Sequence, residues 1–437
     1  MRGRRVLLLM PTTSYRGEAF FEAARRLGVE LLAGSDRCHV LAGEWGVPLA
    51  LDFRDPTDAA RQIVDYARRN PIDAIVPVDD KTTLIAALAA GELNLPHNPP
   101  QAAVAARNKQ QMRRALRAAG VPVPRFEVFS IDMPGGELAA RVEASIGYPC
   151  VVKPLTLSAS RGVMRADDAG ALENRRRRLA AILATPEVAA IHGADARSFL
   201  VEEFVPGPEF ALEGMMSDGK LRVLALFDKP DTLDGPFFEE TIYTTPSRQP
   251  ETVQEQLAAC AAAAVAALGL REGPVHAELR LDSRAAAGSG AASSALRVIE
   301  VAGRSIGGLC SRALRFGVGV TLEELILRQA LEPGRELDGW QRERGAAGVM
   351  MMPIPRGGVL QKVDGLEEAR AVPGIESVEI TAALEHVLVP LPEGSAYLGF
   401  IVARGPSAAQ VEESLRRSHA CLRFRITPSI SLEKTPH

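Results

Sequence analysis

The chain has 437 residues, of which 46% are hydrophobic, 5% aromatic and 24% charged, and its formal net charge is −3 at pH 7. This composition is typical of a folded protein with two or three domains, and it gives no reason to expect nucleic acid or an anionic membrane as a partner. No apolar stretch is long enough to cross a bilayer, and the run after the first basic residues stops at Pro11, too early for a secretion signal. The five cysteines lack the spacing of a zinc site or a disulfide framework, so a reduced, cytoplasmic chain is expected.

The first 104 residues alternate buried-strand patterns with helical spacing. Strands are expected at 5–10, 29–34 and 73–78, and helices at 20–27, 59–69 and 82–90. This alternation predicts a parallel βαβ domain, in which ligands bind beyond the carboxyl ends of the strands. Tyr15, Arg16, Asp79 and Asp80 follow such ends. They either line a substrate pocket or cap helices and satisfy turns.

The rest of the chain mixes helices with strands in a less regular order. One helix is expected at 105–119, and strands are expected at 126–129, 150–153, 199–203, 221–227, 275–281 and 296–301. Residues 331–437 indicate a small α+β unit with strands at 348–352, 377–381, 386–389 and 398–403 and a helix at 408–421. The run Arg175–Arg178 lies in a helical context and predicts a solvated helix face.

The segments HAEL and IEVAGRSIGG carry the strongest chemical signal. Glu278 and Glu300 end two strand-like runs, and carboxylates on adjacent strands can hold magnesium, which bridges phosphates. Arg304 adds a planar fork for a carboxylate or phosphate. Gly307 and Gly308 allow backbone N–H groups to approach an anion closely. Together these residues predict phosphoryl transfer to a small anionic substrate.

Upstream residues extend this signal in a fixed order. Lys109 comes first, Lys153 ends an apolar strand, a loop of small residues follows at 157–163, and then comes the acidic segment FLVEEFVPGPEFALEG. This order resembles the ATP-grasp family, and within it the carboxylate–amine ligases, especially the L-amino-acid ligases that make dipeptides. The resemblance covers roughly residues 70–310. It implies an α/β and α+β multidomain ATP-grasp fold, with an N-terminal βαβ domain at 1–104, two lobes clamping ATP at 105–330 and a C-terminal α+β domain at 331–437.

The resemblance implies a nucleotide site for ATP on the first half of this segment. Lys109 and Lys153 would hold phosphates, and a flexible loop would close over them as a lid. The lid residues would be Ser158, Ser160, Arg161 and Gly162. Glu202 would accept a hydrogen bond from the adenine amino group. The backbones of Glu203 and Val205 would pair with the edge of the adenine ring, and Phe204 would pack beneath the ring. Glu209 would bind the ribose hydroxyls.

The resemblance also makes Glu278 and Glu300 the ligands of magnesium or manganese. The family pattern usually has an asparagine two residues after the second glutamate, but here that position is Ala302, so one protein ligand is missing. Together with these two glutamates, Lys153 and Arg304 are the expected catalytic residues. Magnesium and Lys153 would offset the charge of the phosphates.

The substrate side is expected to involve a loop at 227–248 and the strand of Glu278. Glu240 of this loop would meet the substrate's amino group, or be an exposed acid at a sheet edge. Alternation places His276, Glu278 and Arg280 on one strand face. His276 is therefore either a substrate-side residue and candidate base or a structural histidine. Arg304 would clamp the reacting carboxylate, and Gly307 and Gly308 would support its oxyanion.

These residues predict an ATP-dependent ligase that joins an amino acid or similar small carboxylate to an amine through an acyl phosphate, releasing ADP and phosphate. The alternatives are another ATP-grasp enzyme, such as a carboxylase or purine-pathway ligase, and a nucleotide-binding protein without catalysis. The expected partners are small-molecule substrates and, as a homodimer, a second copy of the chain.

Overall fold

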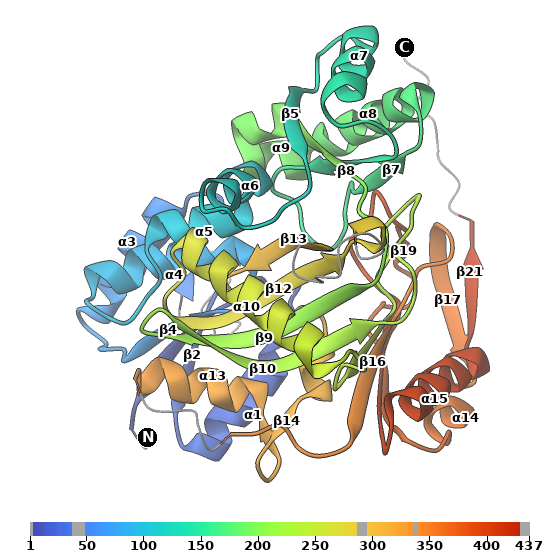
Figure 1. Ribbon diagram of the computed structural model, residues 1–437. Helices are drawn as coiled ribbons and strands as arrows, with labels where there is room; N and C mark the ends of the chain where they lie inside the picture. The colour runs from blue at the N-terminus through green and yellow to red at the C-terminus, as the bar shows by residue number, and fades with distance from the viewer. Residues whose placement is uncertain (1–2, 37–48, 286–294, 335–339, 429–437) are drawn as a thin grey trace, which may run out of the picture.

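The computed structural model describes residues 3–36, 49–285, 295–334 and 340–428. Figure 1 shows an N-terminal unit in blue, a small lobe at the top and a long sheet that carries the C-terminal residues at its far end. None of the described helices is both long enough and apolar enough to cross a membrane.

The N-terminal unit is built on a four-stranded sheet in the order β3–β2–β1–β4. Its strands are β1 (Arg5–Leu9), β2 (Glu30–Ser35), β3 (Leu49–Ala50) and β4 (Ala74–Pro77). Every pair is parallel, and the side chains from Val6 to Leu9 are fully buried. The prediction of a buried parallel sheet in this part of the chain is confirmed.

Three helices accompany this sheet: α1 (Gly17–Leu27), α3 (Pro56–Ala67) and α4 (Asp80–Glu92). Asp79 forms a capping box with Thr82 at the start of α4, where Thr82 Oγ1 accepts a hydrogen bond from Asp79 N at 3.3 Å. Of the two interpretations of Asp79, the geometry therefore supports the helix cap.

The next helical segment is divided in two. Instead of one helix at 105–119, the chain forms α5 (Pro100–Arg107) and α6 (Lys109–Ala118). Asn108 separates them, and its side-chain oxygen accepts hydrogen bonds from the backbone of Gln110 and Gln111 at 3.0 and 3.1 Å. The prediction of one helix was wrong because Asn108 is an N-cap, which starts a new helix at Lys109.

The small lobe has an antiparallel sheet in the order β5–β8–β6–β7. Its elements are β5 (Phe126–Ser130), α7 (Gly135–Ser145), β6 (Cys150–Pro154), β7 (Met164–Ala166), α8 (Ala169–Leu183), α9 (Pro186–His192), the 3₁₀ helix η1 (Gly193–Arg197) and β8 (Ser198–Glu203). Its core is a separate cluster, so the lobe can move relative to the long sheet without opening another core.

The arginine run on α8 is mostly tied to neighbouring segments. Arg175 Nε donates to the Arg165 carbonyl at 3.1 Å, Arg176 binds Glu173, and Arg178 pairs with Glu393 of the C-terminal region. Arg177 is the exposed member of the run. The other three are only partly exposed, because acceptors on α8 itself and on other segments bind them, so the prediction of a solvated face is confirmed only for Arg177.

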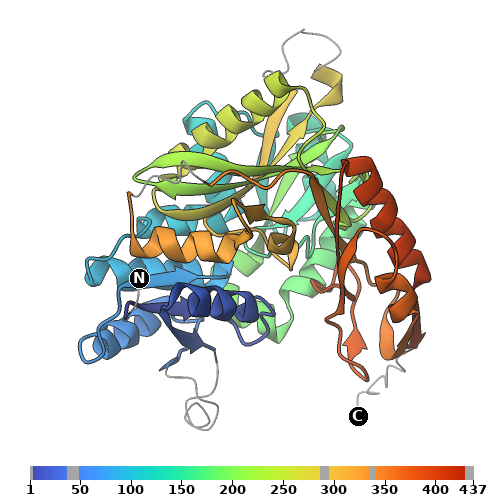
Figure 2. The same ribbon diagram turned by 90° about the horizontal axis from the view of Figure 1, so that it is seen from below.

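The long sheet has eight strands in the order β13–β12–β9–β10–β11–β16–β20–β18. Its strands are β9 (Glu209–Ser217), β10 (Lys220–Lys229), β11 (Ile242–Thr245), β12 (Gly273–Leu281), β13 (Leu296–Ala302), β16 (Ala346–Met352), β18 (Ile375–Ile380) and β20 (Gly399–Gly405). Helix α10 (Glu251–Leu268) packs on one face, and α13 (Leu322–Leu331) lies between the sheet and the N-terminal unit (Figure 2).

The C-terminal residues continue this sheet rather than standing apart. β16, β20 and β18 extend it, and a three-stranded sheet in the order β19–β17–β21 lies beside it. The remaining elements are β17 (Gly358–Asp364), α14 (Leu366–Arg370), β19 (Val387–Leu388), α15 (Ala408–Cys421), β21 (Arg423–Thr427), η2 (Cys310–Ala313), β14 (Arg315–Phe316) and β15 (Val320–Thr321). The predicted helix at 408–421 is confirmed as α15.

One core cluster joins the N-terminal unit to the long sheet. It contains Val6 and Phe20 of the N-terminal unit, Leu325 of α13, Phe227 of β10 and Phe400 of β20. Because these side chains share one close-packed core, the N-terminal unit, α13 and the long sheet form a continuous base. The small lobe has a hydrophobic core of its own, separate from this base.

Candidate active site

A cleft of about 650 Å³ lies between the small lobe and one face of the long sheet. Strands β6 and β8 and the loop after β6 line the side of the small lobe. Strands β9, β12 and β13 line the other side. Because two units with separate cores meet here, the two sides of the cleft can approach one another around a ligand.

The cleft brings together most of the residues expected from the sequence. Those that line it are Lys109, Lys153, Ser158, Ser160, Glu202, Glu203, Phe204, Val205, Glu209, Glu240, Glu278 and Glu300. The expected residues outside its described lining are Arg161, Gly162, His276, Arg304, Gly307 and Gly308.

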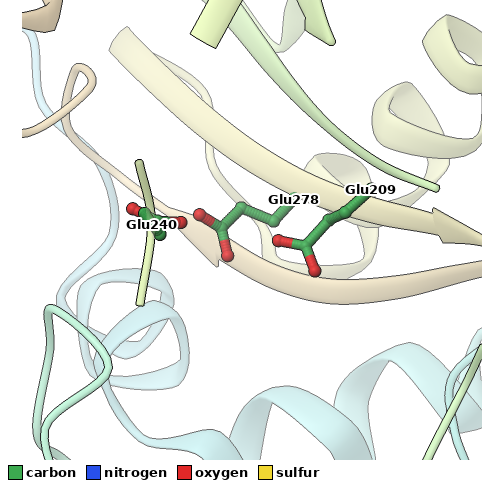
Figure 3. Close-up of side chains that lie close together, drawn as sticks. All are labelled: Glu209, Glu240 and Glu278. Carbon is green, nitrogen blue, oxygen red and sulfur yellow. The ribbon is translucent and has the colours of Figure 1, made fainter. Parts of the chain in front are cut away.

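Three carboxylates gather around one lysine on the long-sheet side. An oxygen from each of Glu209, Glu240 and Glu278 lies within 4.8 Å of the others, and Figure 3 shows the three side chains close together. Lys229 Nζ lies 2.6 Å from Glu209, 2.6 Å from Glu240 and 3.0 Å from Glu278. This group, the acidic cluster, has three acidic side chains for one lysine.

The sheet register explains this arrangement. Glu209 of β9 lies opposite Lys229 of β10 on one side and opposite Arg280 of β12 on the other. Arg280 donates from Nε to Glu209 at 2.6 Å and from its two terminal nitrogens to the carbonyls of Val205 and Leu233. The three strands therefore hold a row of alternating charges. Both oxygens of Glu209 are bound by cations, so its contact with a ribose stays a prediction.

The members of the acidic cluster have very different pKa values, because burial and neighbouring charges act on each of them differently. Burial would raise the pKa of Glu278, but Lys229 and His276 hold it well below the usual range. Burial, together with the charge of Glu278, raises the pKa of Glu240 to about 7. Burial would lower the pKa of Lys229, but the three carboxylates hold it well above the usual range. Glu240 is thus the acid of this cluster that titrates near neutral pH.

The donor atoms of the cleft fit a hard divalent cation. Glu278 lies directly opposite Glu300 across the β12–β13 pair, so the structure brings the two predicted metal ligands together. Glu240 and Glu209 add further oxygens beside Glu278. Oxygen ligands are those that magnesium prefers. The acidic cluster shares only Glu278 with the predicted pair, and sequence reasoning missed Lys229 as its central cation.

On the opposite side of the cleft, two cations surround one buried carboxylate. Glu202 is buried between Lys153, with which it forms an ion pair, and Arg113, whose Nε lies 3.0 Å from it. Burial would raise the pKa of Glu202, but these two cations hold it at about 2. We call this group the basic cluster. Sequence analysis missed Arg113, although it lies one helical turn after Lys109 on α6.

Lys109 links the basic side of the cleft to the predicted metal ligands. Its Nζ donates to the Leu157 carbonyl at 2.9 Å and lies 3.5 Å from Glu300 Oε2. Leu157 precedes the expected lid loop, of which Ser158 and Ser160 line the cleft. Lys109 is therefore placed where it can contact a phosphate between the lid and Glu300.

The second half of the expected lid points elsewhere. Gly162 N donates to the Pro392 carbonyl at 2.9 Å, and a Cβ at Gly162 would meet Leu179 at 3.0 Å. Gly162 has φ +75°, a conformation that favours glycine. Arg161 lies 3.9 Å from Glu187 on the outer side of the lobe. Direct contacts of Arg161 and Gly162 with phosphate are therefore not supported by this structure.

His276 is a positioning residue in this structure rather than a free base. Its Nδ1 lies 3.2 Å from Glu213, and its Nε2 lies 3.5 Å from Glu278. Burial would lower the pKa of His276, but these two carboxylates raise it to about 9. A histidine with such a pKa carries its proton at neutral pH, which disfavours His276 as the base; its role as a candidate base stays a prediction.

Arg304 holds the N-terminal unit to the long sheet. One terminal nitrogen lies 2.9 Å from Asp80 Oδ2, and another donates to the Ser305 carbonyl. Arg16 is buried nearby and donates to the Val78 carbonyl at 2.8 Å. In this structure the Arg304 guanidinium is thus bound by Asp80, so a role as substrate clamp requires a carboxylate that replaces Asp80.

The glycine pair after Arg304 lies under the C-terminal region. Gly308 has φ +63°, and a Cβ there would meet the Phe400 ring at 2.7 Å, whereas Gly307 has open space around it. The Tyr15 and Tyr397 rings lie 5.4 and 5.9 Å from the Phe400 ring. Gly308 therefore allows a close approach of β20. Contact of its amide with an oxyanion stays a prediction.

Comparisons with known proteins agree with this geometry. Three family models match the chain: an ATP-grasp N-terminal domain at 21–97, an ATP-grasp domain at 146–313 and L-amino acid ligase C-terminal domain 2 at 332–427. The crystal structure of an L-amino acid ligase from Bacillus licheniformis is similar over 98% of this chain and 100% of that chain, with a TM-score of 0.79 and 28% identity.

Two curated proteins are also similar to this chain in sequence. The uncharacterized protein y4rH of Sinorhizobium fredii is 26% identical over 97% of this chain and 84% of its own length. An alanine–anticapsin ligase of Bacillus subtilis is 29% identical over 51% of this chain, and this chain spans about half of that ligase, 48%. With its three matched domains and its cleft between two lobes, the chain belongs to the ATP-grasp superfamily and resembles the L-amino acid ligases.

Proposed function

We propose that the protein is an ATP-dependent ligase that joins the carboxylate of an amino acid, or of a similar small acid, to an amine through an acyl phosphate. One observation carries the proposal. Lys153 and Glu202 of the basic cluster and the three acids of the acidic cluster line one cleft, so a single site can hold the phosphates of ATP and the cation that accompanies them. The match to an L-amino acid ligase C-terminal domain supports the amino-acid substrate.

The nucleotide phosphates fit the side of Lys109 and Lys153. Both lysines are buried, and each is close to one carboxylate, Glu300 or Glu202. A phosphate that entered would give these ammonium groups a second anion, and Ser158 and Ser160 of the lid loop would cover it. The adenine would lie against Phe204 and Val205, which line the same cleft.

A magnesium ion would be held by Glu278, together with Glu300 or with Glu240 and Glu209. Bound there, it would neutralise phosphate charge at the place where charge develops. Lys229 already neutralises part of the acidic cluster, and with the cation present its ammonium group would be free to turn towards a phosphate oxygen.

The proposed reaction has two steps. An oxygen of the substrate carboxylate attacks the γ-phosphorus of ATP, the bond to the β-phosphate oxygen breaks, and an acyl phosphate and ADP result. The nitrogen of the amine then attacks the acyl carbon, loses a proton and displaces phosphate, which leaves an amide. Glu240, whose pKa is raised to about 7, is placed in the cleft to accept that proton.

Arg304 would bind the reacting carboxylate during this sequence. The carboxylate would take the place of Asp80 on the guanidinium, so that one ion pair is exchanged for another. Closure of the small lobe would exclude water, which matters because acyl phosphates hydrolyse. The separate core of the small lobe supports such a movement.

The proposal is tested by measuring phosphate release with a panel of amino acids offered singly and in pairs, with mass spectrometry of the products. Hydroxylamine added with ATP and one amino acid should trap the acyl phosphate as a hydroxamate. Phosphate release that requires bicarbonate would favour the carboxylase alternative instead. Binding of ATP with no turnover for any acid and amine would favour the non-catalytic alternative.

A further inference from the structure

A second hollow, of about 790 Å³, lies between the N-terminal unit and the long sheet. We call it the interdomain pocket. Its walls come from α4, α5, α13 and the start of β12, and it shares no lining residue with the cleft. Figure 2 shows α13, in orange, between the N-terminal unit and the long sheet. The pocket is therefore a separate feature from the proposed ligase site.

Small side chains keep this pocket open. Helix α4 lines it with Ala86, Ala87 and Ala90, and α5 lines it with Ala103 and Ala106. Protein interiors are close-packed and contain few voids larger than a water molecule. A hollow between packed helices that is lined by methyl groups offers an apolar surface of the kind that small ligands contact.

A buried amide without a partner faces this space. Gln329 of α13 lines the pocket and is 3% exposed, and in the described structure neither Nε2 nor Oε1 makes a hydrogen bond of normal geometry, although Glu272 lies near it. A buried amide that lacks partners destabilises a fold, so its presence here needs a reason. A polar group on a bound molecule would satisfy it.

Two of the three charged side chains in the pocket, Arg107 and Glu272, form no ion pair within the described ranges. Of the three charged lining residues, Asp80 is paired with Arg304 at 2.9 Å, and Glu272 accepts a hydrogen bond from Asp218 N at 3.0 Å. Arg107 ends α5, and its guanidinium makes no hydrogen bond or ion pair within the described ranges, although the charges of Asp79 and Asp80 act on it. A partly buried guanidinium without an acceptor is suited to an anion, and to a carboxylate above all.

We propose that the interdomain pocket binds a small carboxylate with an apolar body, held by Arg107 and the Gln329 amide, with the alanines of α4 and α5 around its apolar part. This is a second ligand site, independent of the proposed ligase reaction. Its Arg107 comes two residues before Lys109, which lines the cleft, and its Asp80 is the ion-pair partner of Arg304.

The probe for this site is 4-methylpentanoate, compared with the uncharged 4-methylpentanamide. The full-length protein is first saturated with ADP and magnesium so that the cleft is filled, and binding is measured by isothermal titration calorimetry. We expect the carboxylate to bind at millimolar concentrations or below, and the amide to bind about tenfold more weakly or not at all.

Matched variants identify the pocket. Arg107→Leu should weaken carboxylate binding about tenfold or more, whereas Arg114→Leu, which removes an exposed arginine from α6, should leave it unchanged. Ala87→Leu should abolish binding by filling the pocket. Gln329→Leu should weaken binding and raise the melting temperature, because it removes two unsatisfied buried atoms.

Three results would overturn the proposal. The first is an absence of carboxylate binding to the ADP-saturated protein. The second is binding that survives in folded Ala87→Leu and Gln329→Leu. The third is binding that ADP displaces, which would place the probe in the cleft. None of these results depends on turnover, so the pocket and the proposed function can fail separately.

Discussion

The two sides of the cleft are built from the same kinds of side chain in opposite proportions. The acidic cluster places one lysine among three carboxylates, whereas the basic cluster places one carboxylate between a lysine and an arginine. Both groups are largely buried, and Arg280 at Glu209 and His276 at Glu278 partly balance the acidic one. Buried charges are costly unless partners or a ligand compensate them. The acidic cluster is therefore suited to a cation and the basic cluster to an anion. Magnesium and a nucleotide phosphate supply that pair.

The largest effect is expected from removing one charge of the acidic cluster. Glu278→Gln should lower kcat by about a thousandfold. Glu278 lies opposite Glu300 and close to Glu209 and Glu240. It therefore belongs to both of the ligand sets proposed for magnesium. The measurement is steady-state phosphate release over a magnesium titration. The matched control is Glu203→Gln, which changes an acid at the cleft's edge that pairs with Arg125. Equal losses in both variants would show that the acidic cluster has no special role.

The basic cluster should respond through nucleotide binding. Lys153→Met should raise KM for ATP roughly tenfold to a hundredfold, the loss expected for one charge-assisted hydrogen bond to phosphate. Arg113 would still neutralise Glu202, so the variant should remain folded. Lys220→Met removes an exposed lysine and serves as the control. A rise in KM for the amino acid instead of ATP would place the phosphates on the other side of the cleft.

Glu240 provides a pH-dependent test of the same comparison. If Glu240 accepts the amine proton, kcat should rise with pH through about 7 as this carboxyl loses its own proton. Glu240→Gln should remove that rise and lower kcat/KM for the amino acid about tenfold or more. Glu239→Gln changes the neighbouring acid, which lies outside the cleft lining, and should keep the rise. A profile that is the same in all three proteins would exclude Glu240 as the base.

The sequence predicted the residue types of the cleft better than their partners. Alternation along β12 correctly placed Glu278 and Arg280 on one face, and the apolar run ending at Lys153 correctly predicted β6. The prediction missed β9: a strand was expected at 199–203, but none was expected in the acidic segment after Pro208. Without β9 the row of Lys229, Glu209 and Arg280 could not be inferred, since it depends on the register of three strands.

Long-range pairing explains the other differences. Arg304 and Asp80 are 224 residues apart, and Gly162 and Pro392 come from different units. Nothing in the local sequence of either partner indicates the other. Local patterns determine which face of a strand or helix a side chain occupies, whereas the packing of units determines which charges meet. The boundaries at 104/105 and 330/331 stay predictions, and the long sheet runs across the second of them.

The last effect concerns stability rather than activity and comes from His276, whose Nε2 lies 3.5 Å from Glu278 of the acidic cluster. Its pKa is raised from 6.5 to about 9, so between these values the folded protein keeps a proton that the unfolded chain has released. The stabilisation from this histidine is therefore fully present below about pH 6.5 and is lost as the pH rises through about 9. Its size is on the order of 3 kcal/mol. The free energy of unfolding in urea should be measured at pH 6, 7.5 and 9.5. The values for wild type and His276→Gln should converge as the pH rises. The difference between wild type and His386→Gln, which changes an exposed histidine, should stay constant. A gap for His276→Gln that does not change with pH would mean that the histidine is neutral, and it would then return as a candidate base in place of Glu240.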